Sequence, residues 1–234
     1  MAELLYEGKA KQVYKTDKED EYIIHYKDDA TAGNGVKHDK FEGKGVLNNT
    51  ISCIIFDMLE EAGIKTHMIK KLNERDILVK KVDIFPLEVI IRNITTGSFC
   101  KRLGAPEGVV LDEPIFEMSY KNDEYGDPLI NDDHAVALKL ATREELAYIK
   151  ETTLKINELL KEFFLSMNLK LVDFKIEFGK TADGTILLAD EISPDSCRLW
   201  DVDTNQKYDK DVFRQDIGDL IQTYKAVLAR MQNK

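Results

Sequence analysis

The sequence predicts an α+β fold, in which an antiparallel β-rich N-terminal part precedes a mixed α/β part. Three observations lead to this prediction. The first third of the 234 residues alternates short apolar runs with turn residues, as antiparallel strands do. Much of the remainder has the apolar spacing of helices. Regular alternation of strands and helices is absent, so we expect two unlike parts with a cleft between them.

The elements are expected in a definite order along the chain. We predict an antiparallel meander over 4–28, a glycine-rich loop over 31–35, a helix over 47–62, strands over 77–82 and 87–94, a short helix over 99–103, an ordered loop over 106–133, a helix from Thr142, a β hairpin over 169–192 and a last helix from Asp211. Gly63 and Gly104 end two of the helices. Thr142 and Glu145 have capping-box spacing.

Composition excludes several classes of protein. The formal charge of −10 argues against nucleic acid or an anionic membrane as the main partner, although small anionic ligands remain compatible with a local basic cluster. An apolar share of 43% excludes a disordered chain.

The cysteine and histidine content points to a reducing compartment. Cys53, Cys100 and Cys197 are scattered, as are the 4 histidines, so neither a disulfide framework nor a zinc site is expected. No base is identifiable beside Cys197, which we expect to be a packed side chain. Residues 1–5 lack a signal pattern, and no apolar run approaches ~18 residues. We therefore expect a soluble, cytoplasmic protein.

The most informative segment covers residues 171–179. Its period of two places Asp173, Lys175 and Glu177 on one polar face of a strand. Asp183-Gly184 is a strong signal for a two-residue hairpin turn, and such a turn sets Glu177 directly opposite Asp190.

Two facing carboxylates destabilise a sheet unless something offsets their repulsion. Magnesium does so naturally, because it binds one or two carboxylates together with phosphate oxygens. Glu177 and Asp190 are therefore candidate metal ligands. A solvated acid pair with Lys175 as counter-charge is the alternative, and a turn one residue longer would move Asp190 to the other face.

A basic cluster lies near the N-terminus. Strand alternation after Gly8 puts Lys9, Lys11 and Val13 on one face, where two ammonium groups suit nucleotide phosphates and the valine suits a base. The spacing is not that of a Walker loop. The alternative is an exposed edge strand that carries lysine against aggregation.

A second strand end supplies further positive charge. Lys80 and Lys81 close the strand over 77–82, and the backbone that continues from Lys80 to Val82 is a candidate receptor for adenine.

A third cluster is typical of an anion site. Arg92 lies on a strand that runs into Gly97-Ser98 and a short helix, which suits a phosphate monoester. After the strand that carries Asp190, Asp195 and Arg198 come to the same end of the sheet. An ordinary Ser98 N-cap beside a surface arginine is the alternative.

Several of these stretches closely resemble the SAICAR synthetase family. The resemblance runs along essentially the whole chain, and its most specific segments are residues 86–98, 171–179 and 190–201. It implies a kinase-like or ATP-grasp-like ATP cleft between two lobes, which we place at residues 1–84 and 85–234. It also implies ATP-dependent ligation of L-aspartate to carboxyaminoimidazole ribonucleotide (CAIR) to form SAICAR, ADP and phosphate, with Mg²⁺ and usually as a homodimer.

The resemblance also assigns roles to matching residues. Lys9 and Lys11 would bind ATP phosphates, Glu177 and Asp190 would hold Mg²⁺, Arg92, Ser98 and Arg198 would bind the phosphate end of CAIR, and Asp173 and Lys175 would lie near the reacting groups. Asn34 stands where the family often has aspartate. We expect ATP to phosphorylate the CAIR carboxylate, so that the aspartate amine attacks an acyl phosphate.

Two other functions fit parts of this pattern. A Mg-ATP phosphotransferase that acts on a small hydroxyl compound would share the nucleotide half, and the cluster of Arg92, Ser98 and Arg198 separates it from the ligase. A silent nucleotide-binding module would bind adenine nucleotides without releasing phosphate.

Overall fold

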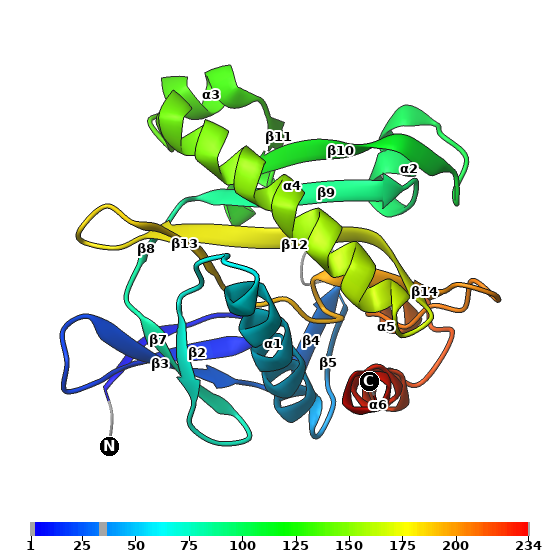
Figure 1. Cartoon of the computed structure of the whole chain (residues 1–234), viewed down its shortest axis with the longest axis horizontal. Helices are drawn as coiled ribbons and strands as arrows, with labels where there is room; N and C mark the ends of the chain where they lie inside the picture. Colours follow the sequence, from blue (N-terminus) through cyan, green and yellow to red (C-terminus); the bar gives the residue numbers. More distant parts are fainter. Residues whose placement is uncertain (1–2, 33–36, 234) are drawn as a thin grey trace.

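Two antiparallel sheets form the framework of the structure, a computed structural model that describes residues 3–32 and 37–233 (Figure 1). The first has the order β1-β2-β3-β7-β6 and consists of β1 (Leu4–Glu7), β2 (Lys11–Lys15), β3 (Glu21–Tyr26), β7 (Asp76–Lys80) and β6 (Met68–Lys71). The second has the order β11-β10-β9-β12-β13 and consists of β11 (Leu129–Ile130), β10 (Val110–Tyr120), β9 (Leu87–Ile94), β12 (Leu169–Lys180) and β13 (Ile186–Ala189), with β8 (Asp83–Ile84) and β14 (Cys197–Asp201) also paired to β12. A separate pair joins β4 (Asp29–Ala32) to β5 (Lys37–Lys40).

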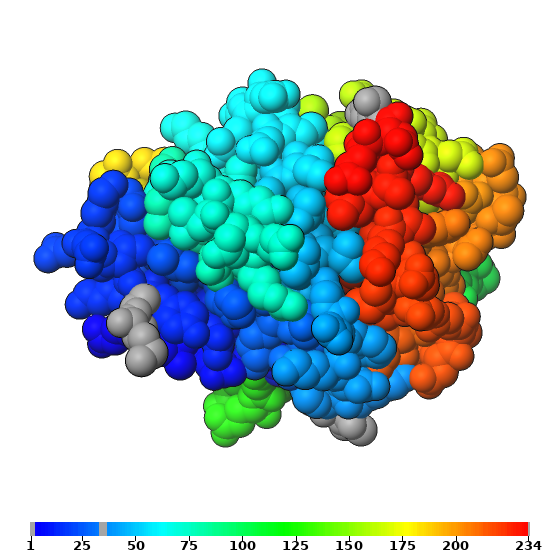
Figure 2. All heavy atoms as spheres, turned by 90° about the horizontal axis from the view of Figure 1, so that it is seen from below, coloured from blue at the N-terminus to red at the C-terminus, as the bar shows by residue number. Residues whose placement is uncertain are grey.

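Helices cover these sheets and close the core. They are α1 (Lys44–Glu61), α2 (Gly97–Leu103), α3 (Asp132–Ala137), α4 (Arg143–Leu165), α5 (Asp211–Arg214) and α6 (Leu220–Gln232), with a 3₁₀ turn at Asp123–Tyr125. The long helix α4 crosses the second sheet and packs on β12 and β9 (Figure 1). Helix α1 packs on β3 and β6 of the first sheet, and α6, red in Figure 2, lies against α1.

The predicted fold class and the strongest local patterns are confirmed. The N-terminal meander is β1, β2 and β3, paired antiparallel in sequence order. Helix α1 ends before Gly63, whose φ is +86°, and α2 ends before Gly104 at φ +66°. Helix α4 begins at the predicted capping box, where Thr142 and Glu145 exchange side chain to backbone hydrogen bonds.

The predicted loop over 106–133 is wrong in its main part. Its centre is the 11-residue strand β10, which pairs with β9. Pro114 lies inside this strand, where the pairing register shifts between Val110 and Ile115. Proline is tolerated at such an irregularity, because a ladder hydrogen bond is missing there anyway.

Two other predictions need correction. Thr31 and Ala32, predicted as loop, belong to β4, while the rest of that predicted loop, including Asn34, lies outside the described residues. The single last helix is two helices, α5 and α6, and Ile217 between them is 57% exposed. Asp219 starts the second one by accepting the Gln222 N–H.

The chain crosses from the first sheet to the second at residues 81–82, between β7 and β8. The sheets also meet through Thr66 and Leu188, which form an isolated bridge. The predicted lobe boundary at residue 84 lies just past this crossing and stays a prediction. Within the described part of the chain, no helix has the length and apolar character needed to cross a membrane.

Candidate active site

The predicted register between Glu177 and Asp190 is wrong. Glu177 on β12 pairs with Ala189, one residue before Asp190. Thr181 and Thr185 close the hairpin with a backbone hydrogen bond of 3.0 Å, so the loop between them is one residue longer than the predicted turn. Because strand pairing has a period of two, that residue shifts Asp190 out of the predicted pair.

The two carboxylates nevertheless interact electrostatically. Asp190 lies directly after β13 and has a φ of +62°, a left-handed conformation. Glu177 is 3% exposed and is therefore not solvated, whereas the side chain of Asp190 is 32% exposed. Burial and the nearby Asp190 charge raise the pKa of Glu177.

Lys11 joins the first sheet to this acidic pair. Its ammonium group on β2 forms an ion pair with Asp190 and lies 3.0 Å from a Glu191 oxygen. It also lies 5.4 Å from the centre of the Tyr26 ring. Although burial acts in the opposite direction, the Lys11 charge lowers the pKa of Asp190 to about 2.

Two further lysines face Glu177. Lys121, at the end of β10, donates to both Glu177 oxygens at 2.6 and 2.7 Å. Lys175 on β12 binds Glu88 and lies 3.9 Å from Glu177. Lys121 and Glu88 were not among the predicted site residues. We call Lys11, Lys121, Lys175, Glu177 and Asp190 the carboxylate–lysine centre.

The donor chemistry of this centre fits magnesium. Glu177 and Asp190 offer hard carboxylate oxygens, and the ammonium groups of Lys11 and Lys121 that pair with them show that cations are stabilised there. The described residues contain no group of three or more His, Cys, Asp or Glu arranged for a metal ion. Two protein carboxylates suit a magnesium ion that takes its other ligands from phosphate and water.

The remaining residues of the basic cluster lie beside this centre. Gly8 turns the chain between β1 and β2, where its N–H donates to Lys11 O at 2.8 Å. Lys9 is exposed and pairs with Asp123 at 2.9 Å. The edge-strand alternative is wrong, because β2 lies between β1 and β3.

The predicted adenine contacts lie where the two sheets meet. Val82 covers Gly179 on β12 so closely that a Cβ at Gly179 would come within 2.5 Å of Val82 Cγ2. Val13 packs, half-buried, against the main core. Lys80 is exposed at the end of β7, and its N–H already donates to His67 O at 2.7 Å.

Arginine and acidic side chains alternate across the second sheet. The Asp173 Oδ2 atom accepts from Arg92 Nη1 at 3.0 Å and from Arg198 Nη1 at 2.9 Å, so one carboxylate joins both arginines. The complete chain of ion pairs runs through Arg102, Glu117, Arg92, Asp173, Arg198, Asp211 and Arg214.

Arg92, Asp173, Arg198 and Arg214 of this chain of ion pairs line a cavity of about 170 Å³, which we call the arginine cavity. Ser98 contributes its hydroxyl, which accepts from Arg92 Nη2 at 3.1 Å and does not cap α2. Arg92 is 3% exposed, so it is not a surface arginine. Burial raises the pKa of the Cys197 thiol in the cavity wall, as expected for a packed side chain.

Asp195 also lines the arginine cavity, but its carboxylate is already engaged. It pairs with Lys44 at 2.6 Å and Lys210 at 3.4 Å, and it accepts the Tyr224 hydroxyl. Burial acts in the opposite direction, yet the two ammonium groups hold the pKa of Asp195 well below its usual range.

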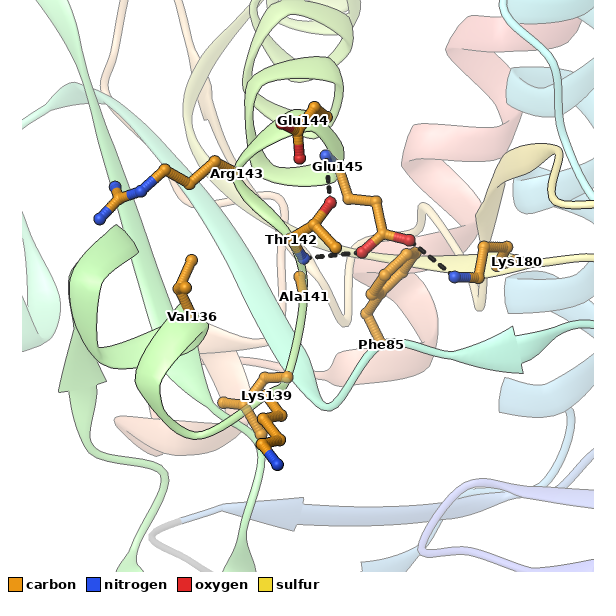
Figure 3. Close-up of a pocket in the computed structure, with 10 residues that line it drawn as sticks. Phe85, Val136, Lys139, Ala141, Thr142, Arg143, Glu144, Glu145 and Lys180 are labelled. Atoms are coloured by element: carbon orange, nitrogen blue, oxygen red, sulfur yellow. Dashed lines mark hydrogen bonds and ion pairs between the residues drawn. The ribbon is translucent and has the colours of Figure 1, made fainter.

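A larger cavity of about 590 Å³ lies at the start of α4 (Figure 3). Its polar groups serve the helix cap, since Glu145 bonds both the Thr142 N–H and Lys180. None of the predicted site residues lines it. The chemistry therefore concentrates in the carboxylate–lysine centre and the arginine cavity.

Comparisons with known proteins identify the family of the chain. The family model described as SAICAR synthetase matches residues 4–231. A phosphoribosylaminoimidazole-succinocarboxamide synthase from Finegoldia magna is 67% identical over 98% of this chain and 99% of its own, and the enzyme of that name from Caldanaerobacter subterraneus is 61% identical over 98% and 97%.

Solved structures give the same result. A SAICAR synthetase in complex with ADP has a TM-score of 0.95 and 51% identity, covering 98% of this chain and 97% of its own. The enzyme from Ehrlichia chaffeensis has a TM-score of 0.96 and 45% identity, covering 98% of each chain. The chain therefore belongs to the SAICAR synthetase family and is an ATP-dependent ligase, which joins L-aspartate to CAIR in purine biosynthesis.

Proposed function

We propose that the chain performs this ligation through an acyl phosphate, with ATP at the carboxylate–lysine centre and CAIR at the arginine cavity. The observation that supports this most strongly is the position of Lys175. Lys175 is one of the residues that line the arginine cavity, and its ammonium group lies 3.9 Å from Glu177. A phosphoryl donor and a carboxylate acceptor placed at the two sites would therefore meet at Lys175.

The nucleotide roles follow from charge. Glu177 and Asp190 would hold Mg²⁺, which neutralises charge on the β- and γ-phosphates when bound. Lys11 and the exposed Lys9 would bind the phosphates, and Gly8 lets the backbone turn beside them. The ADP complex of a relative at 51% identity supports a nucleotide site in this chain.

The adenine end is assigned to the junction of the two sheets. Val82 and Val13 would pack against the base, and the chain at Lys80 would border it. Because the strand crossing lies here, a bound base would contact both sheets.

The arginine cavity suits the phosphate end of CAIR. Arg92 and Arg198 offer guanidinium groups already fixed by Asp173, and Ser98 offers a hydroxyl. Since Asp173 holds both arginines, we assign it a positioning role in preference to accepting the amine proton. Asp195 lies at the same cavity beside Lys44 and Lys210.

The reaction needs activation because a carboxylate has no good leaving group. A CAIR carboxylate oxygen attacks the γ-phosphorus, the bond to the β-phosphate oxygen breaks, and ADP leaves. The aspartate amine then attacks the carboxyl carbon, phosphate departs with that oxygen, and the amine loses a proton. Lys175 would stabilise the charge on the transferring phosphoryl group.

Oxygen isotope transfer tests this route. With ¹⁸O in both CAIR carboxylate oxygens, we expect one labelled oxygen in each phosphate released. Unlabelled CAIR in ¹⁸O water is the control and should give unlabelled phosphate. Unlabelled phosphate, with the second labelled oxygen of each consumed CAIR carboxylate released into water, would overturn the acyl phosphate. Phosphate release should also require both CAIR and L-aspartate, which separates the ligase from a phosphotransferase.

We further propose a homodimer in the cytoplasm, as the family resemblance implies. Light scattering should then give twice the mass of one chain, and a monomer at micromolar concentration would contradict it.

A further inference from the structure

Asp209 is a buried carboxylate that none of the proposed roles uses. It lies between β14 and α5 and is 0% exposed. One of its oxygens accepts the Leu199 N–H at 2.9 Å, and the other accepts the Asp211 N–H at 2.7 Å. The carboxylate therefore connects the strand to the start of the helix through two backbone hydrogen bonds.

Both of those hydrogen bonds act next to Arg198. Leu199 follows Arg198 on β14, and the Asp211 carboxylate binds Arg198 Nε at 2.9 Å. Arg198 has little freedom elsewhere, because its Nη1 binds Asp173 and a Cβ at Gly97 would come within 2.8 Å of its Nη2. Asp209 thus holds the backbone beside Arg198 and the backbone of Asp211, its partner on α5, at a fixed separation.

The charges around Asp209 do not favour its ionised form. Among the described residues it has no ion-pair partner. The titratable and charged groups that face it are Asp211 on α5, Cys197 and Arg198 on β14, and Tyr224 on α6. Burial and the Asp211 charge raise the pKa of Asp209 to about 7, although Arg198 acts in the opposite direction. Protonation turns one carboxylate oxygen into a hydroxyl, which is a donor and a poorer acceptor, so it weakens one of the two backbone hydrogen bonds.

We propose that Asp209 is a positioning residue for the phosphate end of CAIR: its ionised carboxylate holds Arg198 in the arginine cavity, and protonation releases part of that hold. This proposal rests on the proposed function of Arg198. It makes the affinity for CAIR, but not for ATP, depend on a proton at a group that touches neither substrate.

The test is D209N, because asparagine keeps the size of the side chain but has one acceptor oxygen. We compare kcat and the KM values for CAIR and ATP from pH 6 to 8.5. At pH 8 the variant should have a KM for CAIR raised about five-fold, as expected for one lost hydrogen bond, with kcat and the KM for ATP unchanged. At pH 6 the ratio of the KM for CAIR in D209N to that in the unaltered chain should approach one, because Asp209 is then protonated in the unaltered chain.

Titration of the CAIR phosphate changes the KM of both proteins equally, because both bind the same substrate, so it cancels in the ratio of their KM values for CAIR.

D201N is the matched control. Asp201 lies on the same strand, is buried, accepts the Asp203 and Thr204 N–H groups and pairs with Arg230. The D201N variant should have lower thermal stability and an unchanged KM for CAIR at every pH. The proposal is overturned if the KM for CAIR in D209N equals that in the unaltered chain at every pH, or if the ratio of the two does not change with pH.

A second variant separates this proposal from the proposed function. If R198K leaves the KM for CAIR unchanged, the role of Arg198 itself is wrong. If R198K raises that KM but D209N does not, only the role of Asp209 is wrong. If D209N does not fold, the change in the KM for CAIR between pH 8 and pH 6 is measured for R198K and for the unaltered chain. The proposal is overturned if R198K shows the same change as the unaltered chain.

Discussion

The carboxylate–lysine centre and the arginine cavity lie beside each other but are built differently. In the first, flexible lysines pair with acids across two sheets, as Lys11 on β2 does with Asp190. In the second, arginines on β9 and β14 share the Asp173 carboxylate in one sheet. An ammonium group is a mobile point charge, whereas a guanidinium group bound at two of its nitrogens is fixed in orientation.

This difference matches what each site must do. The nucleotide phosphates change charge and connectivity during the reaction, so lysines that can exchange carboxylate partners for phosphate oxygens are suitable. The CAIR phosphate stays unchanged, so a rigid site loses little entropy on binding it. The predictions below test whether one site carries turnover and the other carries affinity.

The largest effect is expected at the metal carboxylates. E177Q and D190N should each lower kcat by about 10²-fold or more with the fold intact, because charge on the transferring phosphoryl group is no longer neutralised. Steady-state kinetics across a Mg²⁺ titration measure this. D183N, in the turn of the same hairpin, is the control and should keep full kcat. Full activity of the E177Q/D190N double variant would refute the metal assignment.

Substitution of Arg92 should weaken the binding of CAIR and leave kcat nearly unchanged. R92K should raise the KM for CAIR by about ten-fold and leave the KM for ATP unchanged, because lysine cannot reproduce the three bonds to Glu117, Asp173 and Ser98. The alanine variant should show the same split, with a further loss of about 3–5 kcal/mol of stability from buried unpaired acids. R75K, in the turn between β6 and β7 of the first sheet, is the control. A shift in the ATP constant would mean that the two ligand sites are exchanged.

Lys11 and Lys9 should differ in the same assay. K11A should raise the KM for ATP by about ten-fold and K9A by about two-fold, since exposed charges contribute little. The side chain of Lys11 is 13% exposed, against 53% for Lys9. A larger effect for K9A than for K11A would contradict the assignment of Lys11 as the principal phosphate ligand.

The smallest effect is expected at the junction of the sheets. G179A should cost about 1–3 kcal/mol of stability, because its Cβ would displace Val82. Thermal unfolding measures the loss, and the KM for ATP should rise slightly as Val82 moves. G184A, where a Cβ meets nothing within 4 Å but φ is +88°, should lose stability without changing that KM. Unchanged stability of G179A would show that this contact is not tight.

Local patterns predicted those elements whose stabilisation is itself local. The capping box of α4 and the glycine after α1 act within one turn of chain, so their residues suffice to predict them. Strand β10 carries Pro114, a residue that argues against a strand interior, and this signal outweighs the alternation of apolar and polar residues over 116–120 until pairing with β9 is seen. The hairpin register depended on one residue of loop length, which the signal at Asp183-Gly184 did not fix.

The site shows the same division. Glu177, Arg92 and Arg198 lie in recognisable segments and were predicted. Their partners Glu117, on β10, and Lys121, directly after it, are brought within bonding distance only by the folded sheet. The interaction of the two carboxylates was predicted from direct pairing, whereas Glu177 pairs with Ala189 and Asp190 acts on it from one residue beyond the pair.

The central claim is that Glu177 and Asp190 together hold the metal of the nucleotide. Crystals grown with Mn²⁺ and a non-hydrolysable ATP analogue, measured for anomalous scattering of manganese, test it directly. We predict one anomalous peak at about 2.1 Å from an oxygen of each carboxylate and from a phosphate oxygen. A metal bound only by phosphate and water, with Lys121 still on Glu177 and Lys11 still on Asp190, would contradict it.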